Sequence, residues 1–177
     1  MSNSEIDPGD AVHPGNPVTV DRYTAAARVN HWITAISLVL LALSGLALFH
    51  PSLFFLTVFF GGGEWTRTIH PWLGVVLFVS FLGLFFRFWK LNLWKREDGT
   101  WLARVRDVVA GHEEKLPEVG KYNAGQKLVF WSMSLLILVL ITSGIVIWDQ
   151  YFGPYFTITQ KRVAVLVHAV TAVIAIS

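Results

Sequence analysis

Six histidines are the residues of this chain best suited to metal or redox chemistry, because the sequence contains no cysteine. The absence of cysteine excludes disulfides, thiolate-bound iron–sulfur clusters and covalent haem attachment through a C-x-x-C-H motif. Any redox metal must therefore be held by other side chains, among which neutral imidazole is a common ligand. The six positions are His13, His31, His50, His70, His112 and His168.

The composition around these histidines points to lipid as the solvent. Hydrophobic residues make up 54% of the 177 residues and charged residues only 15%, which is unusual for a soluble domain of this size. The eight tryptophans lie mostly near the ends of apolar runs, as membrane interfaces favour. The net charge is +2, and the basic residues gather in one loop beside the apolar runs. We therefore expect a membrane protein with no nucleic-acid partner.

Four apolar segments are long enough to cross a bilayer, which needs about 20 residues. They run over residues 31 to 50, 70 to 89, 128 to 148 and 160 to 176. His50-Pro51 ends the first segment and starts a short interfacial one, whereas His70-Pro71 starts the second. The sequence thus predicts an all-α membrane protein, a four-transmembrane-helix bundle. The fourth helix, with about 17 residues and no basic or aromatic anchor at its end, is expected to be truncated.

Polar segments complete the chain. Residues 1–20 lack the apolar core of a signal peptide, so we expect a disordered polar tail before a transmembrane domain of residues 21–177. Residues 90–127 form a charged connection in which residues 101–110 could form an amphipathic interfacial helix. Eleven Lys or Arg lie at the N-terminal flank or in the stretch from Arg87 to Lys127, against three in the other two connections. The positive-inside rule therefore predicts a cytoplasmic N-terminus.

Depth in the membrane decides which histidines can act together. His70 is expected at the outward start of the second helix, and His168 about seven residues, or roughly 10 Å, into the fourth from the same side. An imidazole in a membrane segment is costly and is a functional hypothesis by default. His70 and His168 can therefore clamp one haem as axial ligands near the outer face. His31, expected at the cytoplasmic start of the first helix, has no second ligand at its depth.

Other polar and small residues are open to two interpretations. His50 is read as an interfacial hydrogen-bonding residue, and His13 and His112 as solvated. Arg87 either snorkels to the interface or pairs with a haem propionate. Glycines within the apolar segments suit helix packing or the close approach of a flat macrocycle. They are Gly45, Gly74, Gly83 and Gly144.

Amide side chains, glycine and lysine are concentrated from Val119 to Lys127, directly before the third apolar segment. A quinone head group could accept hydrogen bonds there from Asn123, from Gln126 or from a backbone N–H beside Gly125. The plainer interpretation is a polar helix entry.

Four motifs in this order resemble one family. They are Arg-Val-Asn-His31-Trp, Ile-His70-Pro-Trp-Leu-Gly, Val-Gly-Lys-Tyr-Asn-Ala-Gly-Gln-Lys-Leu-Val-Phe-Trp131 and Leu-Val-His168-Ala. Over residues 21–177 the chain resembles the gamma subunit of respiratory formate dehydrogenase, a di-haem cytochrome b. The third motif is the most specific part of the resemblance.

The resemblance implies two haem b groups. His70 and His168 would bind the outer haem, whose ligand set is complete here. His31 would be one ligand of the inner haem, whose other ligand this sequence does not contain. Asn123, with its neighbours Gly125 and Gln126, would border the pocket of the quinone substrate. No catalytic residue is expected.

The resemblance further implies an electron-transfer subunit of a formate:quinone oxidoreductase rather than an enzyme on its own. In anaerobic respiration it would pass electrons across the bacterial inner membrane from an iron–sulfur beta subunit to quinone. A molybdenum or tungsten alpha subunit would oxidise formate. Two alternatives stay open: a cytochrome b subunit of a hydrogenase or other periplasmic oxidoreductase, and a haem-free membrane anchor or transporter.

Overall fold

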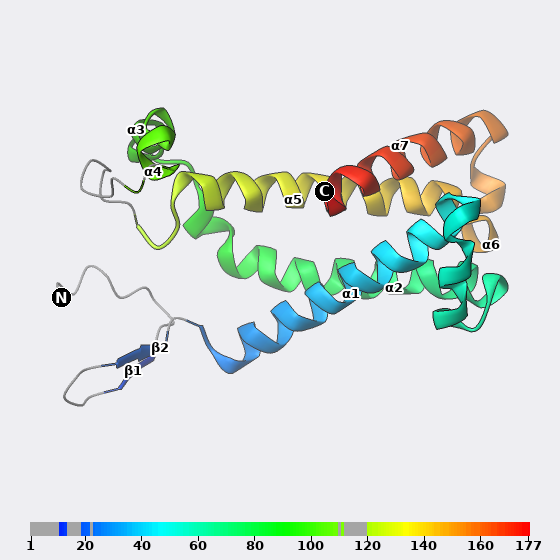
Figure 1. Ribbon diagram of the computed structural model, residues 1–177, viewed down its shortest axis with the longest axis horizontal. Helices are drawn as coiled ribbons and strands as arrows, with labels where there is room; N and C mark the ends of the chain where they lie inside the picture. Colours follow the sequence, from blue (N-terminus) through cyan, green and yellow to red (C-terminus); the bar gives the residue numbers. More distant parts are fainter. Residues whose placement is uncertain (1–10, 14–18, 22, 110, 112–119) are drawn as a thin grey trace. The chain divides into compact units, whose positions relative to one another are not determined.

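Long helices dominate the protein (Figure 1). The computed structural model describes residues 11–13, 19–21, 23–109, 111 and 120–177. The four long helices are α1 (Ala25–Phe49), α2 (Gly63–Phe88), α5 (Ala124–Ile147) and α7 (Ile158–Ile176). The shorter helical elements are η2 (Pro51–Phe60), η3 (Trp89–Asn92), α3 (Arg96–Ala103), α4 (Val105–Val109), α6 (Asp149–Phe152) and η5 (Gly153–Tyr155). A two-stranded antiparallel ribbon pairs β1 (Ala11–His13) with β2 (Thr19–Asp21).

Among the described residues, four helices are long and apolar enough to cross a membrane: α1, α2 continued by η3, α5 and α7. Large apolar side chains on these helices point outward, with Val39, Val79 and Leu135 each more than half exposed. Such exposure would be a liability in water but is what lipid requires of a spanning helix. The predicted all-α fold with four transmembrane helices is confirmed, and the chain is a multi-pass membrane protein.

The first two spanning helices begin earlier than the sequence predicted. The Thr24 hydroxyl accepts a hydrogen bond from the backbone N–H of Ala27 at 3.3 Å, so this N-cap starts α1 six residues before His31. Helix α2 starts at Gly63, after a turn in which Gly61 and Gly62 have positive φ.

Pro71 was expected in the first helical turn but lies inside α2. Its missing N–H removes only one intrahelical bond, and the helix continues through it. The expectation that His31 and His70 open their helices was wrong, because each follows nearly two turns of helix.

The charged connection also differs from its prediction. A helix over residues 101–110 was expected, whereas the structure has α3 from Arg96 to Ala103 and α4 from Val105 to Val109. The interpretation of His112 as solvated lies outside the described residues, and so does the predicted disorder of residues 1–10 and 14–18. The ribbon of β1 and β2 was not predicted.

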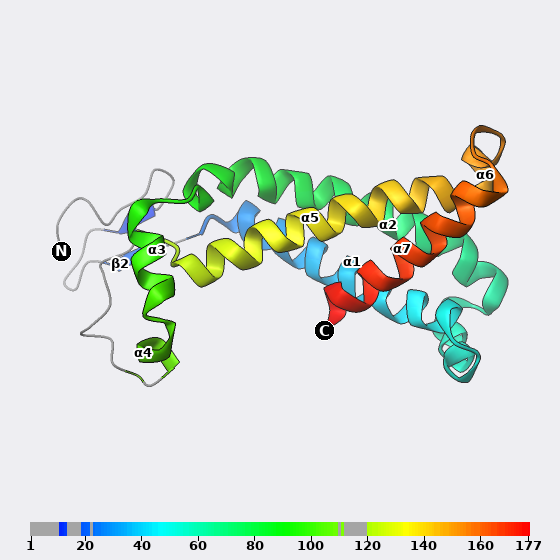
Figure 2. The same ribbon diagram turned by 90° about the horizontal axis from the view of Figure 1, so that it is seen from above.

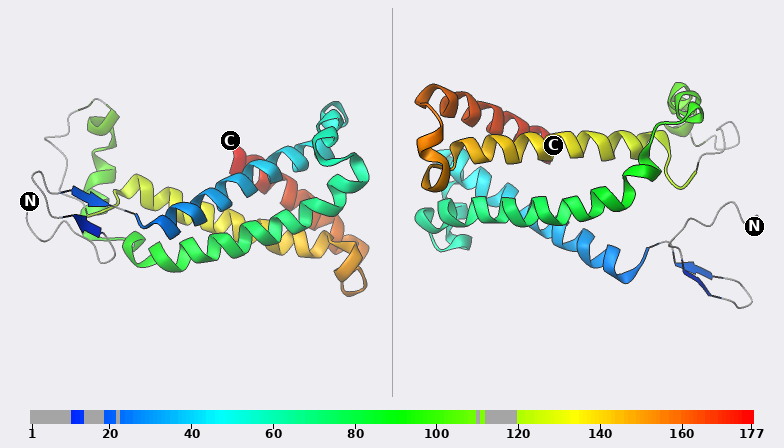
Figure 3. Two further views of the ribbon diagram at one scale, coloured as in Figure 1. Left: turned by 90° about the horizontal axis from the view of Figure 1, so that it is seen from below. Right: turned by 180° about the vertical axis from the view of Figure 1, so that it is seen from behind.

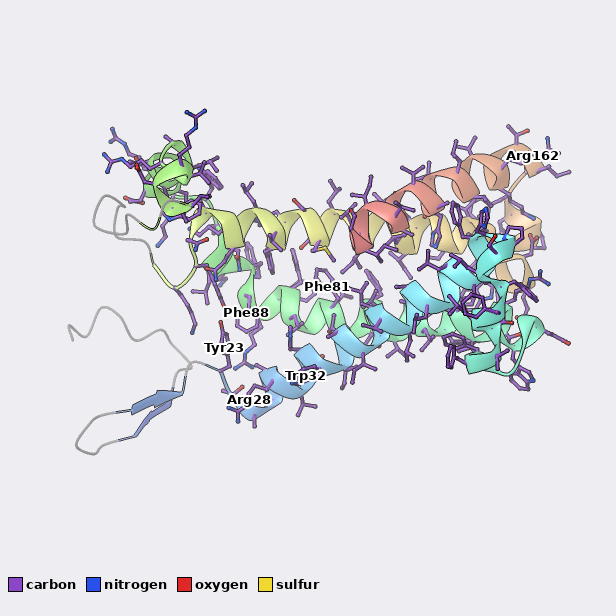
Figure 4. The ribbon with its side chains drawn as sticks, viewed as in Figure 1. Tyr23, Arg28, Trp32, Phe81, Phe88 and Arg162 are labelled. Atoms are coloured by element: carbon purple, nitrogen blue, oxygen red, sulfur yellow. The ribbon has the colours of Figure 1, made fainter. Side chains whose placement is uncertain are left out.

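The chain divides into two compact units. The first comprises residues 1–28 and 85–132, and the second comprises residues 29–84 and 133–177. In the first unit Tyr23 meets the ring of Phe88 edge-on at 6.1 Å (Figure 4), and Trp131 donates a hydrogen bond to the carbonyl of Asn92 at 2.9 Å. These contacts join segments that are distant in the sequence.

The second unit is built from two helical hairpins. Figures 2 and 3 show α1 joined to α2 through η2, and α5 joined to α7 through α6 and η5. Buried positions in this unit are mostly small or polar, such as Ser44, Ala47, Thr66 and Ser143. Small side chains let helix backbones approach closely in lipid, where burial of large apolar groups gives no advantage.

Candidate functional site

Two histidines from different hairpins meet inside the second unit. The rings of His70 on α2 and His168 on α7 lie with their centroids 6.3 Å apart and their planes at 71°. One metal ion held by two imidazoles, each through a bond of about 2.0 Å, separates the ring centroids by about 6 Å once the ring radii are added. The spacing of the pair therefore suits a single metal ion bound between the two rings.

Each ring of this histidine pair is held by a serine on the other helix of its hairpin. His70 Nδ1 lies 2.8 Å from the Ser44 hydroxyl on α1, and His168 Nδ1 lies 2.9 Å from the Ser143 hydroxyl on α5. Because Nδ1 is engaged in both rings, Nε2 is the nitrogen left to bind a metal.

Glycines make room beside both rings. A Cβ at Gly45 would stand 3.3 Å from His70 Cε1, and one at Gly144 would stand 3.5 Å from His168 Cε1. Gly74 has open space around it, whereas a Cβ at Gly83 would meet the amide nitrogen of Asn30 at 2.7 Å. Of the four glycines singled out from the sequence, Gly45 and Gly144 thus border the histidine pair.

His31 lies apart from the pair. It is fourteen residues before Gly45 on the same helix, a distance of about 21 Å along the axis. Its side chain is exposed beside Trp32, with the ring centroids 6.0 Å apart. Within the described part of the chain, no three or more His, Cys, Asp or Glu side chains gather as a metal site. A haem site of the bis-histidine type needs only two.

His50 has a local structural role. Its Nδ1 accepts a hydrogen bond from the backbone N–H of Ser52 at 3.2 Å and so caps η2. This contact agrees with the interpretation of His50 as an interfacial hydrogen-bonding residue. Arg87 is exposed and donates a hydrogen bond to the Thr24 hydroxyl at 3.0 Å.

A polar network joins α1 to α2 next to His31. The Asn30 amide donates to the carbonyl of Ser80 at 3.0 Å, and the Ser80 hydroxyl lies 2.7 Å from Asn30 Oδ1 and 2.6 Å from the Thr34 hydroxyl. Interhelical hydrogen bonds of this kind contribute modestly to association in lipid. The network fixes the register of the two helices at the residue before His31.

Asn123 and Gln126 form a reciprocal cap at the start of α5. Asn123 Oδ1 accepts from the backbone N–H of Gln126 at 2.9 Å, and Gln126 Oε1 accepts from that of Asn123 at 3.0 Å. Both amide oxygens are therefore used, and the amide NH2 groups are the donors that a ligand could use. At Gly125 a Cβ would stand 3.3 Å from the Trp101 ring, so this glycine lets the indole of α3 reach α5.

A buried ion pair between α3 and α5 lies in the first unit. Lys127 Nζ is 2.7 Å from Asp98 Oδ2, and both side chains are almost fully buried. Burial alone would raise the pKa of the Asp98 carboxyl. The hydrogen bonds from Lys127 and from the backbone of Lys95 outweigh it, and the pKa of Asp98 lies below its ordinary value. Asp98 is therefore ionised at neutral pH and ties α3 to the first turn of α5.

Ser44 and Ser143 are the site residues that sequence reasoning missed. The sequence feature that could have indicated them is a Ser-Gly dipeptide, which occurs in both the first and the third spanning helix. Serine in an apolar helix is ordinarily read as a packing residue, and the sequence does not say which residues face each other across a hairpin.

Two imidazoles on two membrane helices, each with Nδ1 held by a serine and a glycine beside the ring, are typical of a membrane cytochrome b. The family model described as prokaryotic cytochrome b561 matches residues 22–176. The chain belongs to this family.

Known relatives agree with this family. The chain is 43% identical over 155 residues to the cytochrome b556(fdo) subunit of formate dehydrogenase from Escherichia coli (strain K12), covering 88% of this chain and 72% of that protein. It is 41% identical to the nitrate-inducible cytochrome b556(Fdn) subunit of the same strain, covering 84% and 69%. It is 35% identical to the formate dehydrogenase cytochrome b556 subunit of Haemophilus influenzae, covering 89% and 66%. The resemblance stated from the sequence motifs is confirmed.

Proposed function

We propose that this chain is the membrane cytochrome b subunit of a formate dehydrogenase and carries electrons from an iron–sulfur partner subunit to quinone. The histidine pair carries the proposal, because the ring centroids of His70 and His168 lie 6.3 Å apart, which is the spacing of a bis-histidine metal site, and a serine occupies Nδ1 of each ring. The names of the relatives support formate as the source of the electrons. The chain acts as an electron-transfer subunit without a catalytic residue of its own.

His70 and His168 would hold haem b through Nε2. Haem b supplies a one-electron couple whose potential depends on axial ligands, hydrogen bonds and burial. Gly45 and Gly144 keep the space beside the ligand rings open. His31 is a ligand of a second, inner haem, and we assign no partner to it.

Asn123, Gly125 and Gln126 form the quinone-binding edge. The reciprocal cap holds the two amide side chains in place and leaves their NH2 groups as donors to a quinone carbonyl. The N–H groups of the first helical turn have no partner inside the helix. The N–H of Gly125 is therefore a third donor.

The partners follow from the same proposal. An iron–sulfur beta subunit delivers electrons on the outer side, and a molybdenum or tungsten alpha subunit oxidises formate. The chain lies in the bacterial inner membrane with its N-terminus in the cytoplasm, because eleven of the fourteen Lys and Arg flank that side. Quinone reduction on the cytoplasmic side would take up protons there and so build a proton-motive force.

Reduced-minus-oxidised optical spectra of the purified complex test the haem assignment. We expect a b-type alpha band in the native protein, and the loss of the outer-haem contribution in His70→Ala and in His168→Ala. His50→Ala is the matched control, since His50 caps η2, and should keep the full band. Retention of all haem in both ligand variants would overturn the assignment. Reduction of the band by formate, set against reduction by hydrogen, distinguishes formate dehydrogenase from a hydrogenase partner.

A further inference from the structure

The two serines that touch the histidine pair have the same surroundings on two hairpins. Ser44 precedes Gly45 on α1 and contacts His70 of α2. Ser143 precedes Gly144 on α5 and contacts His168 of α7. Ser44 is fully buried and Ser143 nearly so. Each hairpin therefore supplies one imidazole together with one hydroxyl and one glycine from the facing helix.

The hydroxyl group of each serine also has an acceptor on its own helix. Ser44 Oγ lies 2.8 Å from the carbonyl of Leu40, and Ser143 Oγ lies 2.6 Å from the carbonyl of Val139, one turn back on its own helix. A carbonyl oxygen can only accept, so a serine bonded to it spends its single hydroxyl proton in that bond. In that arrangement the serine oxygen offers the histidine only lone pairs, and the imidazole is the donor.

The direction of this hydrogen bond decides the tautomer of both rings. With the serine proton on the helix carbonyl, His70 and His168 would each donate Nδ1–H to a serine, and an unprotonated lone pair would be left on Nε2. Each proton belongs to a short chain of hydrogen bonds from the imidazole to the hydroxyl to a helix carbonyl. In such a chain each bond polarises the next, and a low-dielectric surrounding strengthens both.

We propose that Ser44 and Ser143 are positioning residues for the outer haem, which fix the ligating tautomer of His70 and His168 and lower the midpoint potential of the haem. The inference rests on the proposed function. A hydrogen bond accepted from Nδ1–H makes the imidazole a more basic ligand, and a more basic ligand stabilises ferric over ferrous iron. Because both imidazoles carry such a bond, the two effects would act in the same direction.

Redox titration of the purified complex, with electron paramagnetic resonance of the ferric haem, tests the proposal. In Ser44→Ala and in Ser143→Ala the ferrous-to-ferric ratio of the outer haem at a fixed ambient potential should rise about threefold to tenfold, a shift of about 28–59 mV for a one-electron couple. The ferric signal should change with it, since the ligand field depends on the basicity of the imidazole. The component lost in His70→Ala identifies which titration belongs to the outer haem.

Two sets of variants serve as controls. Ser44→Thr and Ser143→Thr keep the hydroxyl and its bond back along the helix, and should keep the native potential. Thr142→Ala removes a hydroxyl that bonds back to the carbonyl of Leu138 at 2.8 Å, from an exposed position one residue before Ser143. Its potential should equal that of the native protein.

Every other outcome either supports or overturns the proposal. Unchanged potentials and signals in both Ser→Ala variants, with haem content intact, would overturn the role of the serines and leave the haem assignment standing. Haem loss in the Ser→Ala variants supports the proposal if the Thr variants restore it and overturns it if they do not. Haem retained in both His70→Ala and His168→Ala would overturn the proposed function and this inference together.

Discussion

Gly45 and Gly144 border equivalent rings, yet the space beside them is not equal. A methyl group at Gly45 would stand 3.3 Å from His70 Cε1, so the ring must give by a few tenths of an ångström, whereas 3.5 Å at Gly144 is ordinary contact. A shift of that size at His70 also strains the bond to Ser44. The contact distances therefore predict that an added methyl group is tolerated less well at Gly45 than at Gly144, although the sequence does not distinguish the two positions.

Gly45→Ala should lower the affinity for the outer haem by about tenfold, the lower end of what disturbed ligand support costs. Gly144→Ala should have a smaller effect. Gly74→Ala, with open space around it, should gain up to about 1 kcal/mol of helix propensity. The haem-to-protein ratio after purification measures the first two effects, and denaturation in detergent measures the third. Equal ratios in the Gly45 and Gly144 variants would contradict the ranking.

The pairing of α1 with α2 depends on the network of Asn30, Thr34 and Ser80. A Cβ at Gly83 would lie 2.7 Å from the Asn30 amide nitrogen. Gly83→Ala should therefore break the hydrogen bond from the Asn30 amide to the Ser80 carbonyl. Buried polar groups that lose a partner cost about 1–3 kcal/mol, and interhelical bonds in lipid lie near the low end. Both Gly→Ala changes gain the same helix propensity, so we expect Gly83→Ala to be about 1 kcal/mol less stable than Gly74→Ala when both are denatured in detergent. Gly74→Ala on the same helix is the control, and equal stability of the two variants would refute the role of the network.

The attachment of α3 to α5 depends on one buried ion pair. Asp98→Asn keeps an acceptor for the N–H of Lys95 but leaves Lys127 charged and unpaired, which costs about 3–5 kcal/mol for a buried pair. Adding Lys127→Met should recover most of the loss. Thermal unfolding of the three proteins measures the effect. A double variant no more stable than Asp98→Asn would show that the charge is not the cause.

The same pair predicts how stability depends on pH. The folded pKa of Asp98 lies below its ordinary value of 3.8. The contribution of this carboxylate is therefore fully present above that value and is lost as pH falls through the folded pKa. Between pH 5 and 8 it should be constant. Below pH 4 the native protein should lose more stability than the Asp98→Asn and Lys127→Met double variant, and parallel acid curves would contradict this.

The sequence predicted the four spans of this fold well, and their ends less well. Apolar runs without charge show where a helix must lie in lipid. The start of α1 depends on a cap at Thr24, and that of α2 on a glycine turn before a proline that the helix tolerates. The meeting of His70 with His168 followed from depth. The contact of each histidine with a serine could not be predicted, because the sequence of one helix does not determine its rotation relative to a neighbouring helix.

Basic residues are distributed unequally between the connections at the two ends of the spanning helices. α2 with η3 is long enough to span, and its two ends differ in charge, since the connection that follows carries most of the basic residues. By the positive-inside rule we expect that connection in the cytoplasm. This expectation matters for the proposed function, because the side on which quinone would be reduced decides whether electron flow would build a proton-motive force.

The absence of cysteine makes this orientation directly measurable. Glu64 and Thr100 are both exposed, one near the start of α2 and the other in α3. In spheroplasts a membrane-impermeant maleimide should label Glu64→Cys directly and Thr100→Cys only after lysis, while the native chain stays unlabelled. The reverse pattern would place the N-terminus and the basic connection outside. Labelling of both positions from the outside would mean that α2 does not span, which would contradict the fold as a membrane bundle as well as its orientation.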